Sequence, residues 1–194
     1  MSGRPRLRAL ELAEDPASWA ALGFCVADGR CVVGTTELRL RGGGGGITGW
    51  ELDDAGGPPP PDPTHPNRVV GVDHVVLQAA DLEAVVAGLE RNGLPCRGRR
   101  AAGDLRQAFH LLADALIEVV GPAQPPPDAD ASWSFWGLTL VCEDLDAAAA
   151  LLGERLGHVK DAVQPGRRIA TVRAQEAGVH VPLAFITPRV PGGR

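Results

Sequence analysis

The sequence predicts an α+β fold built of tandem β-α-β-β-β modules. Two segments rich in proline and glycine, 41–68 and 121–132, divide the 194 residues into three blocks. The middle and last blocks superpose when Asp81 is aligned with Asp144, which gives an internal repeat of about sixty residues. We therefore expect the following organisation: a degenerate module over 1–52, a linker over 53–68, a module over 69–122, a linker over 123–132 and a module over 133–190.

The first block is a faint copy of the module. The segment "RLRALELA" (6–13) is suited to its first strand. Asp15 followed by Pro16 is typical of the start of a short helix. Three further segments are strand candidates: "FCVAD" (24–28), "RCVVG" (30–34) and "ELRLRG" (37–42).

The middle block begins with "VVGVDHVVLQ" (69–78), an apolar run suited to a strand covered on both faces. Asp81 can cap the helix that follows, and Asn92-Gly93 can end it. The apolar residues of that helix keep the spacing i, i+3, i+4 and i+7: Leu82, Val85, Val86 and Leu89. Three strand candidates complete the block: "LPCRGRR" (94–100), "RQAFHLL" (106–112) and "ALIEVVG" (115–121).

The last block repeats this plan. The segment "WGLTLVCE" (136–143) is its first strand, and Asp144 can cap a helix that closes near Gly157. The apolar residues of this helix have the same spacing as before: Leu145, Ala148, Ala149 and Leu152. Three strand candidates follow: "HVKDAVQ" (158–164), "RRIATVR" (167–173) and "VHVPLAFITP" (179–188).

The composition indicates the class of protein. The net charge of -5 argues against generic nucleic-acid binding. Neither an apolar run of membrane-spanning length nor a signal peptide is visible, so we expect a cytoplasmic protein without a membrane partner. The four cysteines contain no CxxC pair and are interpreted as small buried residues. A single lysine beside many arginines is typical of a GC-rich bacterial genome.

A tandem β-α-β-β-β unit that opens with "DHVVL…DL" and closes with "ALIEVVGP" resembles the vicinal oxygen chelate superfamily. This superfamily includes glyoxalase I, extradiol dioxygenases, methylmalonyl-CoA epimerase and bleomycin-resistance proteins. The resemblance covers Val69 to Pro188 and implies two curled sheets around one cavity, with metal ligands on the first and fourth strands. The matching positions are His74 and Glu118, which could hold one divalent Zn, Ni, Mn or Fe ion and serve as the catalytic pair.

The repeat limits this metal site. In the last block the positions equivalent to His74 and Glu118 are Gly137 and Ala184, and in the first block they are Arg8 and Arg39. None of these four can complete a cation site, so at most half of the ligand set is present: His74 and Glu118. Two alternatives remain open, namely a metal-free general base and a hydrogen-bonded pair in a binding cavity.

The strand before Glu118 predicts which residues face the cavity. A two-residue hairpin turn at 113–114 would place Glu118 opposite Phe109. Phe109 and Gln107 would then contact the substrate, and His110 would face the helix side. A looser loop would reverse this assignment.

Further residues are candidates for substrate binding. Arg167 and Arg168 follow a Gln-Pro-Gly turn and could clamp a carboxylate or phosphate, although a solvated strand end is the simpler interpretation. Trp136, in "SWSFWG", could form a stacking wall or pack in a module interface. His180 lies four residues before Ala184 and, by strand alternation, on the same face, about 13 Å away. That distance is too long for His180 to replace Ala184 as a metal ligand.

These observations predict a glyoxalase-like protein that binds or transforms a small oxygenated or carboxylated metabolite. If it is an enzyme, the expected chemistry is metal-assisted or glutamate-assisted proton abstraction next to a carbonyl, as in isomerases and lyases. The alternatives are a non-catalytic, drug-sequestering protein of the bleomycin-resistance type and a regulatory module without a ligand. Because an odd number of modules leaves one without an intramolecular partner, we also expect a homodimer.

Overall fold

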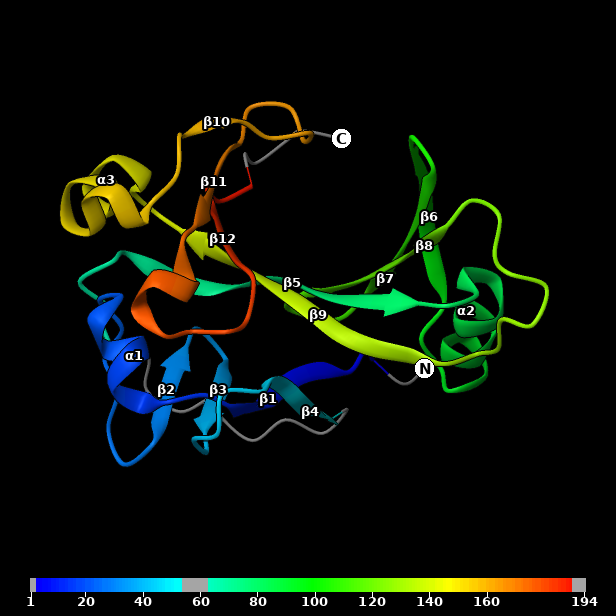
Figure 1. The fold of residues 1–194 in the computed structure, drawn as a ribbon, viewed down its shortest axis with the longest axis horizontal. Coiled ribbons are helices and arrows are strands. Elements are labelled where there is room, and N and C mark those ends of the chain that lie inside the picture. The colour runs from blue at the N-terminus through cyan, green and yellow to red at the C-terminus, as the bar shows by residue number, and fades with distance from the viewer. Residues whose placement is uncertain (1–2, 54–62, 190–194) are drawn as a thin grey trace.

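The computed structural model describes residues 3–53 and 63–189, which form two β-sheets with three α-helices (Figure 1). The N-terminal sheet has the strand order β2-β3-β1-β4. The large sheet has eight strands in the order β10-β11-β12-β9-β5-β8-β7-β6. None of the helices in the described part of the chain is long and apolar enough to cross a membrane.

The N-terminal sheet is the degenerate module. Asp15 caps its helix, accepting a hydrogen bond from the Ser18 amide, and Pro16 occupies the first turn. The candidate strand at 24–28 is reduced to a single bridge between Ala27 and Arg30. The elements are β1 (Arg6–Ala13), α1 (Pro16–Ala21), β2 (Arg30–Val33), β3 (Thr36–Leu40) and β4 (Gly46–Asp53).

Strand β4 corrects the expectation that the whole of 41–68 lacks regular structure. Gly42, Gly43 and Gly44 adopt positive φ and form the turn before it, which is the role that glycine serves in such turns. β4 then pairs antiparallel with β1. It therefore fills the edge of β1 that would otherwise be open.

The middle and last modules have the same strand order. In each of them the first strand pairs in parallel with the last, as β5 does with β8 and β9 with β12. The middle module contains β5 (Val69–Ala79), α2 (Leu82–Arg91), β6 (Cys96–Ala102), β7 (Leu105–Leu111) and β8 (Leu116–Pro122). The last contains β9 (Trp133–Cys142), α3 (Leu145–Leu152), β10 (Lys160–Asp161), β11 (Arg168–Val172) and β12 (Leu183–Ile186), with short 3-10 turns at Gly153–Arg155 and Ala174–Ala177.

Helices α2 and α3 begin where the sequence pattern predicts, but α3 ends at Leu152, before the expected end near Gly157. Asp81 accepts hydrogen bonds from the Glu83 and Ala84 amides, and Asp144 caps α3 through the same two positions after it. The predicted apolar stripe of α2 is buried: Leu82, Val85, Val86 and Leu89. Both helices therefore begin where the aspartates place them and turn their apolar residues toward the sheet.

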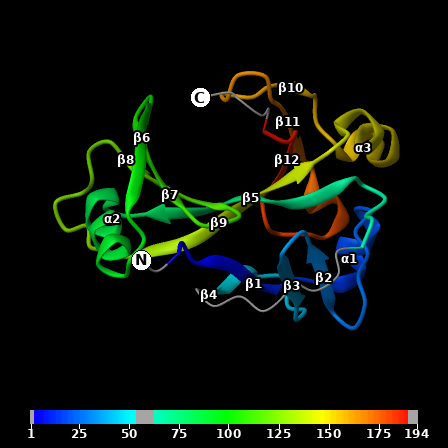
Figure 2. The same cartoon turned by 180° about the vertical axis from the view of Figure 1, so that it is seen from behind.

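Antiparallel pairing of β5 with β9 joins the two modules into one sheet. Its two outer ends, β6 and β10, rise toward the same side, and the N-terminal sheet lies against the opposite side, below β5 and β9 (Figures 1 and 2). We call the side away from the N-terminal sheet the inner face. Side chains of the other face form the core together with the N-terminal sheet: Leu7, Leu10, Leu38, Leu77, Ile117, Leu138 and Leu140.

Candidate functional site

A β-bulge in β5 shapes the candidate site. Val72 of β5 is paired with Leu140 of β9, and His74 is paired with Thr139. Two residues of β5 are therefore passed for one residue of β9. Asp73 is the extra residue, and such a bulge redirects side chains that would otherwise alternate. As a result, Asp73 Oδ2 lies 2.8 Å from His74 Nδ1, although the two residues are neighbours in the chain.

The other ring nitrogen of His74 faces Glu118, as the sequence suggested. His74 Nε2 and Glu118 Oε2 are 3.3 Å apart, and both side chains are mostly buried, at 14% and 12% exposed. Glu118 lies on β8, where it is paired with Val76 of β5. One imidazole is thus held between two carboxylates.

Hydrogen bonds from His74 and Arg167 keep Asp73 charged. Arg167 Nη2 donates to Asp73 Oδ1 at 2.7 Å, and its Nε donates to the Thr187 carbonyl at 2.7 Å. Burial alone would raise the pKa of Asp73, but the hydrogen bonds from His74 and Arg167 outweigh burial and lower that pKa to about 2. Asp73 is therefore a carboxylate at neutral pH and can only accept, so His74 Nδ1 carries a proton.

On its other side, Glu118 is held by a polar chain. Gln107 Nε2 donates to Glu118 Oε1, and Arg100 Nε donates to Gln107 Oε1 at 2.6 Å. The amide of Gln107 is thereby fixed with its nitrogen toward the carboxylate and its oxygen toward the guanidinium. A continuous line of polar contacts runs across the inner face: Arg167, Asp73, His74, Glu118, Gln107 and Arg100.

The hairpin between β7 and β8 has the predicted register. Phe109 is paired with Glu118, and a two-residue turn at 113–114 joins the strands. His110 is fully buried on the opposite face, where Nδ1 contacts the Leu94 carbonyl at 2.7 Å, and burial lowers the pKa of its imidazole. His110 is therefore excluded from the group around Glu118.

The residues around His74 do not fit a resident metal ion. The ladder places Ala184 opposite Thr139, as Glu118 is opposite Val76, which agrees with the internal alignment of the two modules. Gly137 and Ala184 offer no donor side chains, and protein metal sites normally provide three or more ligands. Within residues 3–53 and 63–189, no group of three histidine, cysteine, aspartate or glutamate side chains is arranged to hold a metal.

A cavity of about 460 Å³ adjoins Glu118 on the inner face. Its lining includes Val76, the ladder partner of Glu118, and Val120, two residues further along β8. Trp136 reaches this cavity because a second bulge, in β9 between Phe135 and Gly137, makes it an extra residue. The cavity is mainly apolar and is lined by Val76, Gln78, Ala79, Leu105, Val120, Gly121, Pro122 and Trp136.

Two predicted substrate-binding residues lie elsewhere. Arg168 extends from the strand edge to the start of α3, where its guanidinium pairs with Asp146 through contacts of 3.1 and 2.9 Å. His180 precedes β12 instead of lying in it, so the strand-alternation argument for His180 is wrong. Its backbone amide donates to Glu14 of the N-terminal module at 3.0 Å. Neither side chain reaches the group around Glu118.

Asp73 and Arg100 are two residues of the site that the sequence does not predict. Asp73 carried a usable signal, since two adjacent polar residues in "VDHVV" interrupt an otherwise apolar strand and are compatible with a bulge. Arg100 carried none, because "RGRR" alone does not indicate which of its arginines faces Gln107. Arg167 was identified, but its guanidinium is buried against Asp73 and Thr187.

Comparisons with known proteins identify the fold. No protein-family model matches the sequence, and no curated protein matches it. Methylmalonyl-CoA epimerase from Mycobacterium tuberculosis is 20% identical over 63% of this chain and 91% of its own, with a TM-score of 0.51. A xylose isomerase-like TIM barrel/4-hydroxyphenylpyruvate dioxygenase fusion protein is 11% identical over 97% of this chain and 49% of its own, with a TM-score of 0.56.

Identities this low concern the fold and not the activity. The likeness agrees with the paired β-α-β-β-β modules described above. The chain therefore has the fold of the vicinal oxygen chelate superfamily.

Proposed function

We propose that this protein binds a small oxygenated or carboxylated metabolite on the inner face and that Glu118, assisted by His74, moves a proton on it. The observation that carries the proposal is the imidazole held between two carboxylates, 2.8 Å from Asp73 and 3.3 Å from Glu118. The reaction class would be that of an isomerase or lyase, in which a C–H bond next to a carbonyl is ionised.

The proton balance of this step follows from the contacts. Because His74 Nδ1 donates to Asp73, the Nε2 atom is the one that can exchange a proton with Glu118. Glu118 would take the proton from carbon, the electron pair of the C–H bond would move onto the carbonyl oxygen, and His74 could share the proton before its return. Gln107 would act as a positioning residue, because it fixes the other carboxylate oxygen.

The adjoining cavity supports a ligand with an apolar part. Trp136 offers an indole surface, and Val76 and Val120 offer aliphatic surface directly beside Glu118. At about 460 Å³, the volume lies within the usual range for small-molecule sites, which is roughly 300 to 1,000 Å³. A small metabolite could thus place its acidic carbon near the carboxylate and its apolar part against Trp136.

The competing proposal is a binding protein without catalysis, of the drug-sequestering type. It is favoured by Gly137 and Ala184, which take the positions where metal-dependent relatives would provide ligands. It is also favoured because both oxygens of Glu118 already have neighbours, Gln107 and His74. Under this proposal the polar chain would orient a bound molecule and leave it unchanged.

Hydrogen exchange separates the two proposals. The protein would be incubated in D2O with a panel of small carbonyl and carboxylic compounds, and deuterium gain at carbon would be measured by mass spectrometry. Catalysis predicts exchange in at least one compound that is abolished in Glu118→Gln and retained in Glu154→Gln, which changes an exposed glutamate. If calorimetry shows that the wild type binds a ligand but no Glu118-dependent exchange is seen, the protein binds the ligand without catalysis.

The cellular setting is part of the proposal. We propose a cytoplasmic, bacterial protein, and we retain the homodimer as a proposal although the edge of β1 is filled by β4. A measurement of mass in solution tests the dimer, and a monomeric mass would reject it.

A further inference from the structure

Arg100 differs from the two other arginines around the candidate site. Its Nε donates to Gln107 Oε1 at 2.6 Å, and none of the residues described in the structure binds its two terminal nitrogens. Arg167 is bound to Asp73 at 2.7 Å, and Arg189 lies 4.0 Å from the same carboxylate. Among these three arginines, Arg100 is the one whose charge no carboxylate of the described chain pairs with.

The strand pairing places Arg100 in one row with the cavity beside Glu118. Arg100 is paired with Gln107 of β7, and Gln107 is paired with Val120 of β8. Val120 is in turn paired with Gln78 of β5. Directly paired residues lie on the same face of a sheet, so all four side chains are on the inner face. Since Val120 and Gln78 line the cavity of about 460 Å³, this row leads from the cavity to Arg100.

The neighbouring arginine of β6 lies on the opposite face. Arg99 is paired with Ala108 of β7, which is fully buried. The Arg99 guanidinium forms an ion pair with Glu83 at the start of α2. Because successive side chains of a strand alternate between faces, Arg99 and Arg100 carry the same charge on opposite sides of the sheet. Arg99 is therefore a matched control for Arg100.

The separation of Arg100 from Glu118 limits the ligand. Gln107 joins the two residues by one hydrogen bond at each end, so Arg100 Nε and the nearer Glu118 oxygen are at most about 7 Å apart. A small molecule with its acidic carbon at Glu118 can therefore reach the terminal nitrogens of Arg100. An anionic group would be repelled by the Glu118 carboxylate and attracted by the guanidinium, so it belongs at the Arg100 end.

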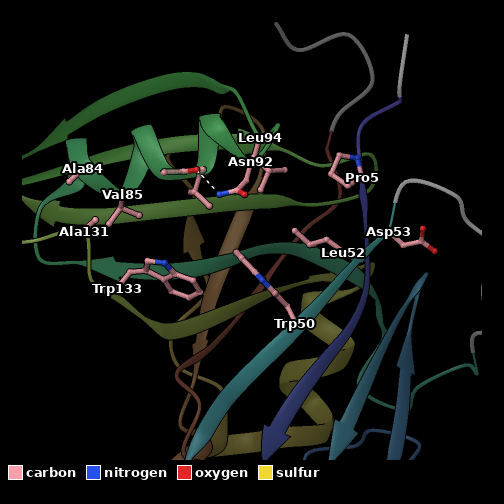
Figure 3. A pocket seen from close by; sticks show the side chains of 12 residues that line it. Pro5, Trp50, Leu52, Asp53, Ala84, Val85, Asn92, Leu94, Ala131 and Trp133 are labelled. Carbon is pink, nitrogen blue, oxygen red and sulfur yellow. Dashed lines mark hydrogen bonds between the residues drawn. The ribbon is translucent and has the colours of Figure 1, made fainter.

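A larger cavity lies outside this row. It has a volume of about 620 Å³ and lies between β4, α2 and the start of β9, where the ring centroids of Trp50 and Trp133 are 5.5 Å apart (Figure 3). It shares no described lining residue with the cavity beside Glu118. Its carboxylate, Asp53, lies 4.0 Å from Arg8 Nε. This cavity therefore has no part in binding an anion beside Glu118.

We propose that the substrate on the inner face carries a carboxylate apart from its acidic carbon, and that Arg100 binds this carboxylate through its two terminal nitrogens. The planar fork of a guanidinium matches the two oxygens of a carboxylate. One arginine also balances the single charge of a carboxylate better than the charge of a phosphate group, which is roughly -2. The inference rests on the function proposed above, in which Glu118 acts on the acidic carbon, and it makes Arg100 the residue that selects the substrate.

The test uses 5-oxohexanoate and its methyl ester, two ketones with the same carbon chain of which only the acid is charged. Their affinities for the full chain would be measured by titration calorimetry. The acid should bind about tenfold more tightly than the ester, because charge-assisted hydrogen bonds are stronger than neutral ones. Equal affinities, tighter binding of the ester or no binding of either compound would overturn the proposal.

Variants locate the carboxylate. Arg100→Gln should abolish the preference for the acid, whereas Arg99→Gln and Arg189→Gln should keep it. Arg100→Met provides a second test if Arg100→Gln fails to fold by circular dichroism. The preference is a ratio of two affinities, so an equal loss for acid and ester in the Arg100 variants would show a structural role and would overturn the proposal. A preference that is lost in Arg189→Gln and kept in Arg100→Gln would likewise overturn it.

Deuterium exchange at carbon separates this inference from the proton transfer. Glu118→Gln should abolish deuterium gain in 5-oxohexanoate and keep the preference for the acid, because Arg100 is unchanged. Exchange that is equally fast in the acid and the ester at low concentration would overturn the role of Arg100 and leave the proton transfer standing. A preference that depends on Arg100, without exchange in any protein, would reject the proton transfer and still support Arg100 as the residue that binds the carboxylate.

Discussion

Asp73 and Arg167 form an ion pair of 2.7 Å between the middle and last modules, and their side chains are only 2% and 3% exposed. The next residue, Arg168, pairs with Asp146 at the surface, where the side chains are 45% and 72% exposed. Two neighbouring arginines thus make ion pairs of similar length in opposite surroundings. Because a buried charge that loses its partner cannot be hydrated, the two pairs should respond differently to mutation.

We predict a large cost for breaking the buried pair. Asp73→Asn and Arg167→Met should each lower the free energy of unfolding by about 3 kcal/mol, and the double variant by clearly less than the sum, because neither charge is then left unpaired. Asp146→Asn and Arg168→Met should have no resolvable effect. Urea denaturation of seven proteins, which include the Asp146→Asn/Arg168→Met double variant, measures both cycles. Additive effects at Asp73 and Arg167 would show that the buried pair is not coupled.

Asp73 should also make the free energy of unfolding depend on pH. The pKa of Asp73 is lowered from 3.8 to about 2, so its carboxylate contributes its full stabilisation of the folded state above about pH 4. This stabilisation is lost as the pH falls toward 2. The difference in free energy of unfolding between the wild type and Asp73→Asn should therefore shrink by about 2 kcal/mol between pH 5 and pH 2. Urea denaturation across this range measures the difference. A constant difference would mean that Asp73 has an ordinary pKa in the folded protein.

Local sequence signals predicted most of the two full modules. The caps at Asp81 and Asp144 and the apolar spacing of the helices depend on neighbours within a few residues, so they are legible in the sequence. The register of Phe109 with Glu118 also depends on one short turn. The expectation that His74 and Glu118 lie together comes instead from the resemblance to the vicinal oxygen chelate superfamily.

The rest depends on partners that are distant in the sequence. The sequence allows Arg167 to be a ligand clamp or a solvated strand end, but its guanidinium is bound to Asp73, which is 94 residues away in the chain. His180 was assigned to a strand, but its amide is held by Glu14, 166 residues away. The glycines before β4 indicated a loop, and only pairing with β1 makes the following segment a strand. The adjacent polar residues Asp73 and His74 are compatible with a bulge, but only the pairing of β5 with β9 fixes its position.

The donor set around His74 predicts a protein without a stoichiometric metal. Protein purified without chelator should contain well below one equivalent of Zn, Ni, Mn or Fe, because Gly137 and Ala184 supply no ligands. Chelator should leave the melting temperature unchanged, since no bound ion would stabilise the fold. Elemental analysis and thermal melts check these outcomes. A stoichiometric metal that is lost in His74→Ala would contradict them and would restore the metalloenzyme interpretation.

Glu14 should anchor the N-terminal module to the last one. Its fully buried carboxylate accepts hydrogen bonds from the His180 and Val181 amides, both at 3.0 Å. Glu14→Gln removes the charge of the acceptor and puts a donor in place of Oε2, which lies 3.1 Å from the His180 amide. The variant should lower the free energy of unfolding by about 2 kcal/mol, because hydrogen bonds to a charged acceptor are stronger than those to a neutral one. Glu154→Gln, at an exposed position, should leave stability unchanged. Hydrogen exchange gives the local readout. The His180 and Val181 amides should exchange faster in Glu14→Gln than in the wild type. The amides of β5 and β8 should exchange faster only by the amount that the lower global stability of the variant explains. Unchanged protection at His180 and Val181 would mean that other contacts hold the two modules together.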